Sequence, residues 1–378
     1  MTSWPTPGPD LPSRAEEFAS VAALHAEQAD SARALPRAVA DGVVEAGFAR
    51  HFVPARWGGS AGSVTDLLHA VSTVAQGCTS AAWCASVLAG AGRMGAYLPE
   101  EGQQELWAKS ADTAVVGALV PRGSATEVTG GWRVTGEWNF TSAVALSDWA
   151  LVCAMVPRAN GREPWFFALP RQDYRVADTW TSVGMRGTGS DTLLADNVFV
   201  PGHRGFRRQD MADGNSVGSD ARCHTAPLRL LSGLLFGAPA LGAARAALRV
   251  WAEHSGAATD DTNVAARTSL ARMAIGVDGA GLLMERAARV ADAPHAGPHE
   301  LVRSPADCAH AVDQLVDVVE ELLRTSGSSG QLAGHPLQRI WRDVHSLASH
   351  VALRFGPVGA AYGARLLDPS AFRRFPTR

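Results

Sequence analysis

Apolar residues recur at helical spacing over the first part of the chain. Residues 1–12 are rich in Pro and Gly and are expected to form a loose tail. Ser13 and Glu16 make a capping-box pattern, which predicts a helix that ends at about Ser31. Further helices are expected from Pro36 to near Gly47, from Ser63 onward, over the apolar segment 80–97 and just after Pro99. The pattern therefore predicts a helical domain over residues 13–112.

From about Ala114 the apolar period changes to two. Trp132, Val134, Trp138 and Phe140 share one parity and polar residues fill the other, which predicts a strand with one dry face. Further strands are expected at 149–156, 165–169, 174–180 and 192–200. These spacings predict a small antiparallel β-barrel or sandwich over residues 113–208.

The helical period returns after Pro227. Long helical segments are expected at 228–255, 263–293, 304–326 and 336–354, with a last one that ends at Leu367. Short connections with Gly and Pro predict an up-down four-helix bundle over residues 209–378. The expected fold class is therefore α+β, with helices, then strands, then a helical bundle.

The composition excludes several classes of function. The formal net charge is -3 and only 19% of the residues are charged, without a basic run that would suit nucleic acid. The five cysteines are far apart and no His pair has metal spacing, so neither a disulfide framework nor a metal site is expected. No signal peptide and no uninterrupted apolar span are visible, so we expect a cytoplasmic protein without a membrane contact.

Three segments carry a family resemblance. They are GGWRVTGEWNFTSAVALSDWA at 130–150, DTWTSVGMRGTGSDTLLADNVFVP at 178–201 and PLQRIWRDVHSLASH at 336–350. In this order they resemble the flavin-contacting strand pair, the next conserved block and the C-terminal Arg-Asp helix of the acyl-CoA dehydrogenase superfamily. The resemblance implies the same fold as the one that the periodicity predicts, with a flavin between the strands and the bundle.

The residues after the Arg-Asp pair distinguish two branches of this superfamily. The dehydrogenases carry a catalytic Glu there, whereas this chain reads RDVHSLASHVALRFGPVG and has none. Without a carboxylate, abstraction of an α-proton from a thioester lacks its base. The oxygenase branch instead has a His, which His350 matches. The chain thus resembles the two-component, flavin-dependent (group D) monooxygenases.

The resemblance implies two catalytic residues, Ser142 and His350. Ser142 would lie near N5 and C4a of the flavin, where its hydroxyl would protect a C4a-hydroperoxyflavin. His350 would deprotonate a phenol or polarise the peroxide, as a pKa of about 6.5 allows. From the residues alone, Ser142 could equally bond to main-chain groups at a strand end. His350 could be an ordinary helix histidine, two turns after Asp343, and His345 is a close competitor.

The resemblance also implies a flavin cradle built from the strand pair and the loop after it. Its cofactor-binding residues would be Trp138, Phe140, Thr141, Ser142, Arg186, Thr188, Gly189 and Ser190. Without a flavin, aromatic residues on an alternating strand would simply pack in the core, and we prefer this interpretation for Trp132. The loop at 186–190 could otherwise be a plain turn. Arg342 and Asp343 are expected to form a structural ion pair.

The expected substrate pocket contains Ala91, Arg93, Trp180 and His345. Family members often have a second His where this chain has Ala91, which weakens the case for phenol hydroxylation by two histidines. A substrate that is already nucleophilic would need less activation, and Arg93 could replace the missing His sterically or electrostatically.

These implications combine into one expected function with alternatives. The chain would use O2 and reduced FMN or FAD, supplied by a separate flavin reductase because no nicotinamide-binding motif is visible. It would hydroxylate an electron-rich aromatic or polyketide-type small molecule in secondary metabolism, such as antibiotic biosynthesis, as a homotetramer. The alternatives are an N-oxygenase of an amine or amino sugar, a desaturase like the dehydrogenases, and a non-catalytic homologue.

Overall fold

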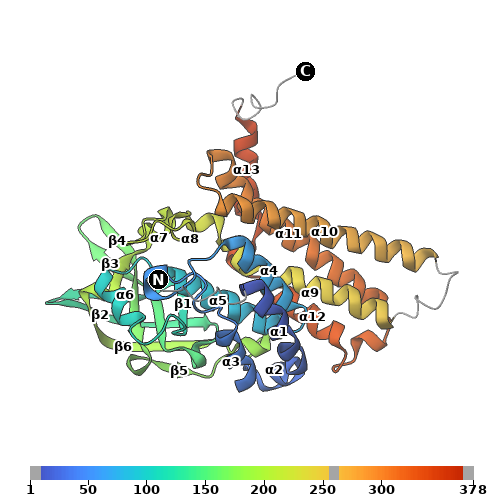
Figure 1. Cartoon of the computed structure of the whole chain (residues 1–378), viewed down its shortest axis with the longest axis horizontal. Coiled ribbons are helices and arrows are strands. Elements are labelled where there is room, and N and C mark those ends of the chain that lie inside the picture. Colours follow the sequence, from blue (N-terminus) through green and yellow to red (C-terminus); the bar gives the residue numbers. More distant parts are fainter. Residues whose placement is uncertain (1–9, 255–263, 369–378) are drawn as a thin grey trace, which may run out of the picture.

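The computed structural model describes residues 10–254 and 264–368, in the order helices, sheet, helices (Figure 1). Helix α1 begins inside the expected tail, because Asp10 caps it and accepts the main-chain N–H of Ser13 at 3.0 Å. The predicted capping box at Ser13 is therefore wrong. The described helices before the sheet are α1 (Leu11–Leu24), α2 (Ala26–Ala32), α3 (Arg37–Glu45), α4 (Val64–Ala75), α5 (Thr79–Gly95) and α6 (Glu100–Leu106).

The middle of the chain forms one seven-stranded sheet in the order β5-β6-β2-β1-β3-β4-β7. Strands β1 and β3 are parallel, and the other neighbours are antiparallel. The expected fold class is confirmed, although the sheet is mixed rather than purely antiparallel. The strands are β1 (Val115–Val128), β2 (Gly131–Thr141), β3 (Trp149–Arg158), β4 (Gly161–Pro170), β5 (Arg175–Ala177), β6 (Asp191–Pro201) and β7 (Gly205–Arg207).

The predicted alternation along β2 holds as far as Trp138. Trp132, Val134 and Trp138 are buried, and Trp132 packs against the rings of Trp165 and Phe167 as a core residue. The alternation breaks at Phe140, which has a φ of +63° and is 68% exposed. The pairing of β2 with β6 shifts register between Trp138 and Thr141, so the ring of Phe140 leaves the core face.

The last five described helices match the predicted bundle in order and approximate length, whereas the two short helices that precede them were not predicted. The described helices after the sheet are α7 (Arg208–Asp213), α8 (Arg222–Thr225), α9 (Ser232–His254), α10 (Val264–Asp292), α11 (Pro298–Thr325), α12 (Pro336–Ala348) and α13 (Phe355–Leu367). Helix α12 ends before His350, which caps the short 3-10 helix η8 (Val351–Leu353). The interpretation of His350 as a helix residue two turns after Asp343 is therefore wrong. The predicted boundaries between the three parts, after residues 112 and 208, stay a prediction.

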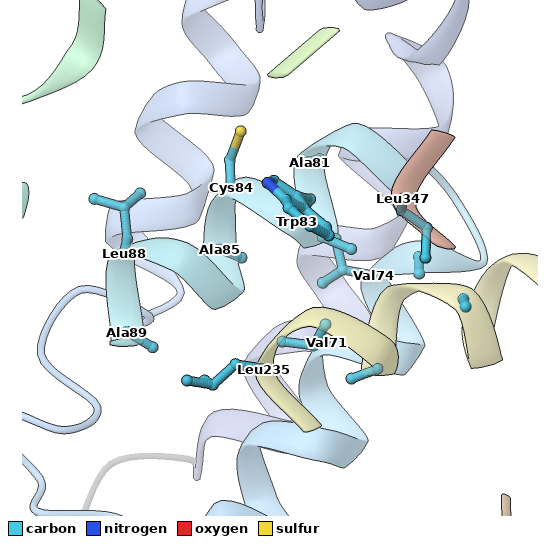
Figure 2. Close-up of a cluster of buried hydrophobic side chains, with 14 of the residues drawn as sticks. Val71, Val74, Ala81, Trp83, Cys84, Ala85, Leu88, Ala89, Leu235 and Leu347 are labelled. Carbon is cyan, nitrogen blue, oxygen red and sulfur yellow. The ribbon is translucent and has the colours of Figure 1, made fainter. Parts of the chain in front are cut away.

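Helix α5 connects the sheet with the bundle. It contacts β1 on one side and α4 and α9 on the other, and nearly all of its residues are buried. Its Ala- and Gly-rich sequence allows this close packing, and Figure 2 shows Trp83, Ala85 and Leu88 of α5 beside Val71 of α4 and Leu235 of α9. Side chains on α5 can therefore reach a space that both the sheet and the bundle border.

Helix α9 belongs to the apolar core. Residues Leu228–His254 are long and apolar enough to cross a membrane by length and composition alone, but 83% of the most apolar window is buried inside the protein. Burial of this kind is typical of a core helix. The structure therefore gives no indication of a membrane protein.

Candidate active site

A cavity of about 1120 Å³ lies between the sheet and the helices. Its walls come from α5, β1, β2, the loop at 179–190, the beginning of α9 and the chain around the end of α12. Ligand pockets in proteins usually measure roughly 300–1000 Å³, so this one has room for two neighbouring small molecules.

An irregularity in β1 opens one wall of the cavity. The pairing with β3 jumps from Ala118 opposite Val152 to Gly123 opposite Ala154. The four residues between, 119–122, therefore leave the ladder, and all four line the cavity. Bulges of this kind often occur beside active sites because they redirect side chains.

Buried hydroxyl groups form a hydrogen-bonded chain at the inner end of β2. Trp83 Nε1 donates to Ser142 Oγ at 2.9 Å, Ser142 Oγ lies 2.8 Å from Ser190 Oγ, and Ser190 Oγ lies 2.7 Å from Thr188 Oγ1. Thr188 Oγ1 donates to the carbonyl of Met185 at 2.8 Å. Each hydroxyl has one proton, so all four bonds form together only when Ser142 donates to Ser190 and Ser190 to Thr188. In this state Ser142 faces the cavity as an acceptor.

His350 also contacts Trp83, edge to face. Its ring centroid is 5.7 Å from that of Trp83 and 3.9 Å from that of Phe236. Burial among these rings lowers the pKa of His350 to about 4, so its imidazole is neutral near pH 7. The main-chain N–H of Ala352 donates to Nδ1 at 3.3 Å, which leaves the proton of the neutral ring on Nε2. His350 therefore offers the cavity a hydrogen-bond donor.

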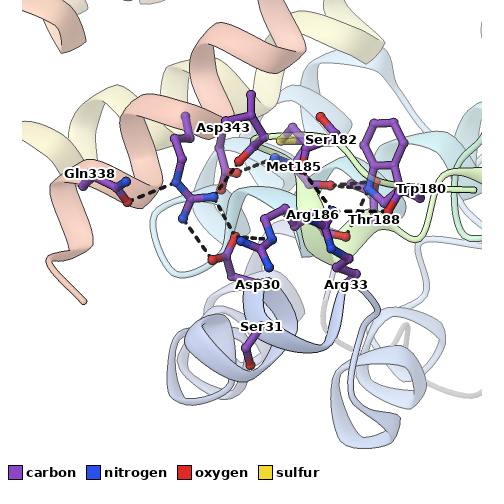
Figure 3. Close-up of polar contacts among 12 residues, drawn as sticks. Asp30, Ser31, Arg33, Trp180, Ser182, Met185, Arg186, Thr188, Gln338 and Asp343 are labelled. Atoms are coloured by element: carbon purple, nitrogen blue, oxygen red, sulfur yellow. Dashed lines mark hydrogen bonds and ion pairs between the residues drawn. The ribbon is translucent and has the colours of Figure 1, made fainter. Parts of the chain in front are cut away.

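The loop at 182–190 is fixed by contacts with α12 and α2 (Figure 3). The contacts with α12 come from Arg342 and Asp343. Asp343 Oδ1 accepts the main-chain N–H of Met185 at 2.5 Å, and Arg342 donates to the carbonyl of Val183 at 2.7 Å. A Cβ on Gly184 would lie 2.0 Å from the carbonyl oxygen of Arg342, so only glycine fits between this loop and α12. The loop is thereby held in one position beside the cavity.

The ion pair that was expected between Arg342 and Asp343 does not form. Arg342 forms its ion pair with Asp30 of α2, with Nη2 2.9 Å from Oδ2. Burial raises the pKa of Asp343 to about 7, and the nearby carboxylate of Asp30 acts in the same direction. Both residues are structural, but they connect α12 to α2 and to the loop.

Most of the predicted site residues line this cavity. Those that do are Ala91, Arg93, Trp138, Phe140, Ser142, Trp180, Thr188, Ser190, His345 and His350. The exposed ring of Phe140 meets Trp180 edge to face, with centroids 6.1 Å apart. The imidazole of His345 is held by Trp341 and Glu320: Nδ1 donates to the Trp341 carbonyl at 2.9 Å and Nε2 lies 3.4 Å from Glu320 Oε2.

Three predicted flavin contacts do not line the cavity. The hydroxyl of Thr141 is buried and donates to the carbonyl of Trp138 at 2.9 Å. Arg186 lies 3.8 Å from Asp30, and Gly189 is a left-handed residue that ends the short helix η4 (Arg186–Thr188). A role for these three in binding flavin stays a prediction.

The two aromatic residues that contact His350, Trp83 and Phe236, were not predicted as site residues. Trp83 contacts both Ser142 and His350, and Phe236 packs against the rings of His350 and Trp83. The only sequence signal for Trp83 is one large indole in a helix of small residues. Phe236 has no comparable signal, because an aromatic residue in an apolar helix usually belongs to the core.

The charged lining of the cavity is entirely basic. Arg93, Arg122 and Arg208 line it, and no Asp or Glu is among its described lining residues. The chain as a whole is slightly acidic, with a formal net charge of -3. The cavity therefore favours anionic ligands.

Two family models match the chain. Residues 11–112 match "Acyl-CoA dehydrogenase, N-terminal domain", and residues 234–355 match "Acyl-CoA dehydrogenase, C-terminal domain". Together the two matches include more than half of the chain.

Known relatives extend over nearly the same length. The flavin-dependent monooxygenase oxygenase subunit HsaA of Rhodococcus jostii is 29% identical over 86% of this chain and 90% of its own. The oxygenase component of an FADH2-dependent resorcinol hydroxylase from Rhizobium sp. is 28% identical over 90% of both chains. The structure of XiaF from Streptomyces sp., in complex with FADH2 and glycerol, superposes with a TM-score of 0.87 at 25% identity over 94% of both chains.

Proposed function

Since the chain belongs to the acyl-CoA dehydrogenase family, as an oxygenase component of a two-component flavin-dependent monooxygenase, we propose that its cavity holds a reduced flavin beside an electron-rich aromatic substrate. The predicted family, the enzyme class and the need for reduced flavin and O2 are confirmed by the relatives. The residue roles and the substrate below are our proposal. The observation that carries it is the cavity in which Trp83 contacts both Ser142 and His350.

The residues of the cavity suit a flavin. Phe140 presents an exposed ring and Trp180 a half-buried one beside buried hydroxyls, which matches a ring system with an apolar face and polar edges. Phe140, Ala143 and Met185 all have positive φ without being glycine, and such backbone cost often marks a ligand site. Trp138, Phe140, Trp180 and the hydroxyls of Ser142, Thr188 and Ser190 would hold the cofactor. Bound reduced flavin supplies the electrons that activate O2.

Ser142 is assigned the task of donating a hydrogen bond toward the flavin. Its proton points to Ser190 in the hydroxyl chain described above, so donation to a ligand requires this chain to reverse or to open. Trp83 keeps the oxygen of Ser142 in place during that change, because the indole N–H can only donate. The surrounding apolar side chains exclude water, which slows the unproductive release of hydrogen peroxide.

His350 is assigned the task of polarising rather than deprotonating. Its neutral ring carries the proton on Nε2, and the low pKa makes it a weak base. Between the two predicted roles, this arrangement favours donation toward the reacting oxygen. An aromatic substrate would then have to be nucleophilic without a histidine base, which agrees with Ala91 in place of the second His.

The cavity also favours this function over the three alternatives. A desaturase would need a carboxylate base, and the described lining has none. A protonated amine or amino sugar would meet three arginines and no acid, which disfavours N-oxygenation. A non-catalytic homologue has no need for aromatic rings and buried hydroxyls that face a large cavity.

We propose the following partners and setting. A separate reductase supplies the reduced flavin, and the substrate is a small polyketide-type aromatic molecule of secondary metabolism in the cytoplasm. A homotetramer is proposed because α13 has no buried residue and projects from the bundle in Figure 1. Phe355 of this helix is 42% exposed and Leu367 is 85% exposed, so a second copy could cover them.

An anaerobic titration tests the proposal. The protein should bind reduced FMN or reduced FAD more tightly than the oxidised form, and butyryl-CoA should not reduce the bound oxidised flavin. Reduction by the thioester would instead support the desaturase. The absence of binding to either flavin would support the non-catalytic homologue.

A further inference from the structure

Helix α5 has two residues that are not buried, Val87 and Gly90, and both of them line the cavity. All other residues of this helix are buried. Val87 and Gly90 follow Trp83 by four and seven residues, so the three lie on one face of the helix. The open surface of α5 therefore faces the cavity, and it begins at the indole that contacts Ser142 and His350.

Packing inside the protein does not require glycine at position 90. A Cβ on Gly92, in the same helix, would lie 2.9 Å from the main-chain carbonyl oxygen of Ala49, which excludes a side chain there. A Cβ on Gly90 would meet only Leu235, with Cδ1 at 3.3 Å and Cδ2 at 3.7 Å. These atoms are the far end of a flexible side chain that also lines the cavity, so a small movement would make room for a methyl group.

The backbone of Gly90 does not require glycine either. Gly90 lies inside α5 and is not among the described residues with positive φ. Glycine inside a helix costs about 1 kcal/mol relative to alanine. Where a glycine serves neither the backbone nor the packing, it allows another molecule to approach the main chain closely. The cavity beside Gly90 is the place from which such a molecule would approach.

The distance along α5 indicates the length of that molecule. Seven residues separate Trp83 from Gly90, which corresponds to about 10 Å along the helix axis. A single ring that reacts beside Ser142 and His350 is too short to reach Gly90, whereas a substrate of several rings would extend along this face. The cavity of about 1120 Å³ exceeds the roughly 300–1000 Å³ of an ordinary ligand pocket, so it can hold such a substrate beside a flavin.

We propose that Gly90 is a specificity-determining residue, whose missing side chain lets the distant rings of a multi-ring hydroxyaromatic substrate lie against the main chain of α5. This inference deepens the proposed function, because it takes the cavity as the substrate site. It makes the substrate a planar molecule of about three rings in line. Val87 would contact the middle of this molecule, between the ring that reacts and the end that reaches Gly90.

The test compares two ligands that share one hydroxylated ring and differ in length. The probes are phenol and 2-hydroxyanthracene, and their Kd values are measured without oxygen on the complex with reduced flavin, by calorimetry and by fluorescence anisotropy. We expect wild type to bind 2-hydroxyanthracene at least about tenfold more tightly than phenol. The same comparison on the flavin-free protein separates this test from the proposed function. If no flavin binds, that function fails, and the effect of residue 90 on probe length is still measured.

Variants assign the preference for length to position 90. Gly90→Leu should weaken the binding of 2-hydroxyanthracene at least about tenfold and leave the Kd of phenol within about twofold of wild type. Gly90→Ala should act in the same direction by a smaller factor, and it should fold because alanine favours a helix. Thermal unfolding checks the fold of each variant, and Gly90→Ala keeps the test decisive if Gly90→Leu does not fold.

The matched control is Gly276→Ala in α10. A Cβ there would also lie 3.3 Å from the end of an aliphatic side chain, that of Val318, but Gly276 is not among the described residues that line the cavity. This variant should leave both Kd values unchanged. The proposal would be overturned if substitution of Gly90 weakened both probes equally or left the binding of 2-hydroxyanthracene unchanged. It would also be overturned if wild type bound 2-hydroxyanthracene no more tightly than phenol.

Discussion

Trp83 Nε1 donates a hydrogen bond to Ser142 Oγ at 2.9 Å, across the boundary between α5 and the end of β2. The same indole ring meets His350 edge to face. One side chain from the first helical part thereby positions a hydroxyl from the sheet and an imidazole from the chain after α12. The site depends on this contact, because neither of the two predicted catalytic residues bonds to the other.

Replacement of Trp83 by Phe should test the hydrogen bond separately from the packing. Phe keeps a ring against Phe236 and His350 but has no N–H, so Ser142 loses its fixed donor. We expect the free energy of unfolding to fall by about 1–2 kcal/mol and the yield of peroxide per O2 consumed to rise. Urea unfolding and an oxygen-electrode assay with catalase measure the two effects. An unchanged peroxide yield would show that Trp83 does not position Ser142 for catalysis.

Replacement of Ser190 by Ala should leave Ser142 able to donate to the flavin. Without Ser190, the proton of Ser142 has no hydroxyl partner in the chain and is free to point to the flavin. We expect the peroxide yield of Ser190→Ala to stay within about twofold of wild type. Strong uncoupling in this variant would mean that the hydroxyl chain acts as a unit and that Ser142 is not its donor.

The pH dependence of stability should report the burial of His350. Its pKa of about 4 in the folded protein lies below the unfolded value of about 6.5, so the unfolded chain binds the proton first as the pH falls. The contribution is fully present above about pH 6.5 and is lost progressively toward about pH 4. Relative to His350→Gln, the wild type should therefore lose up to about 3 kcal/mol over this range. Buried His224 is present in both proteins and cancels in the comparison.

If the free energies of unfolding of wild type and His350→Gln changed with pH in parallel, the burial of His350 would be contradicted. The same low pKa predicts that His350 causes no inflection in the activity between about pH 5.5 and 8.

Gly184→Ala should disturb the loop at 182–190 much more than the same substitution at a glycine inside a helix disturbs that helix. A Cβ on Gly184 would collide with the carbonyl oxygen of Arg342 at 2.0 Å, whereas one on Gly279 of α10 would meet nothing within 4 Å. We expect Gly184→Ala to lower the free energy of unfolding by more than about 2 kcal/mol and to weaken flavin binding. Gly279→Ala, the matched control, should raise stability by about 0.5–1 kcal/mol. Equal stability of the two variants would show that this loop adapts.

The sequence predicted the order of the parts, and most of the site residues that it predicted line the cavity, because periodicity and local motifs are properties of short segments. It could not predict contacts that depend on how distant elements pack. Phe140 left the expected face through a register shift, and His350 left the expected helix because α12 ends at Ala348. Arg342 pairs with Asp30, which lies in a different part of the chain.

The central claim is that Ser142 donates the hydrogen bond that protects activated oxygen at the flavin. The most direct measurement mixes the anaerobic complex of the protein and reduced FMN, or reduced FAD if it binds more tightly, with O2 in a stopped-flow spectrometer without substrate. Wild type should show a transient whose absorbance differs from both reduced and oxidised flavin. In Ser142→Ala this transient should decay about 10–100-fold faster, with matching release of hydrogen peroxide.

The matched control is Ser147→Ala, since the hydroxyl of Ser147 is also buried but bonds to the Val144 carbonyl and Tyr174. Its transient should decay at the wild-type rate. An equally long-lived transient in Ser142→Ala would contradict the role of Ser142, and no transient in the wild type would contradict the proposed oxygenase chemistry itself.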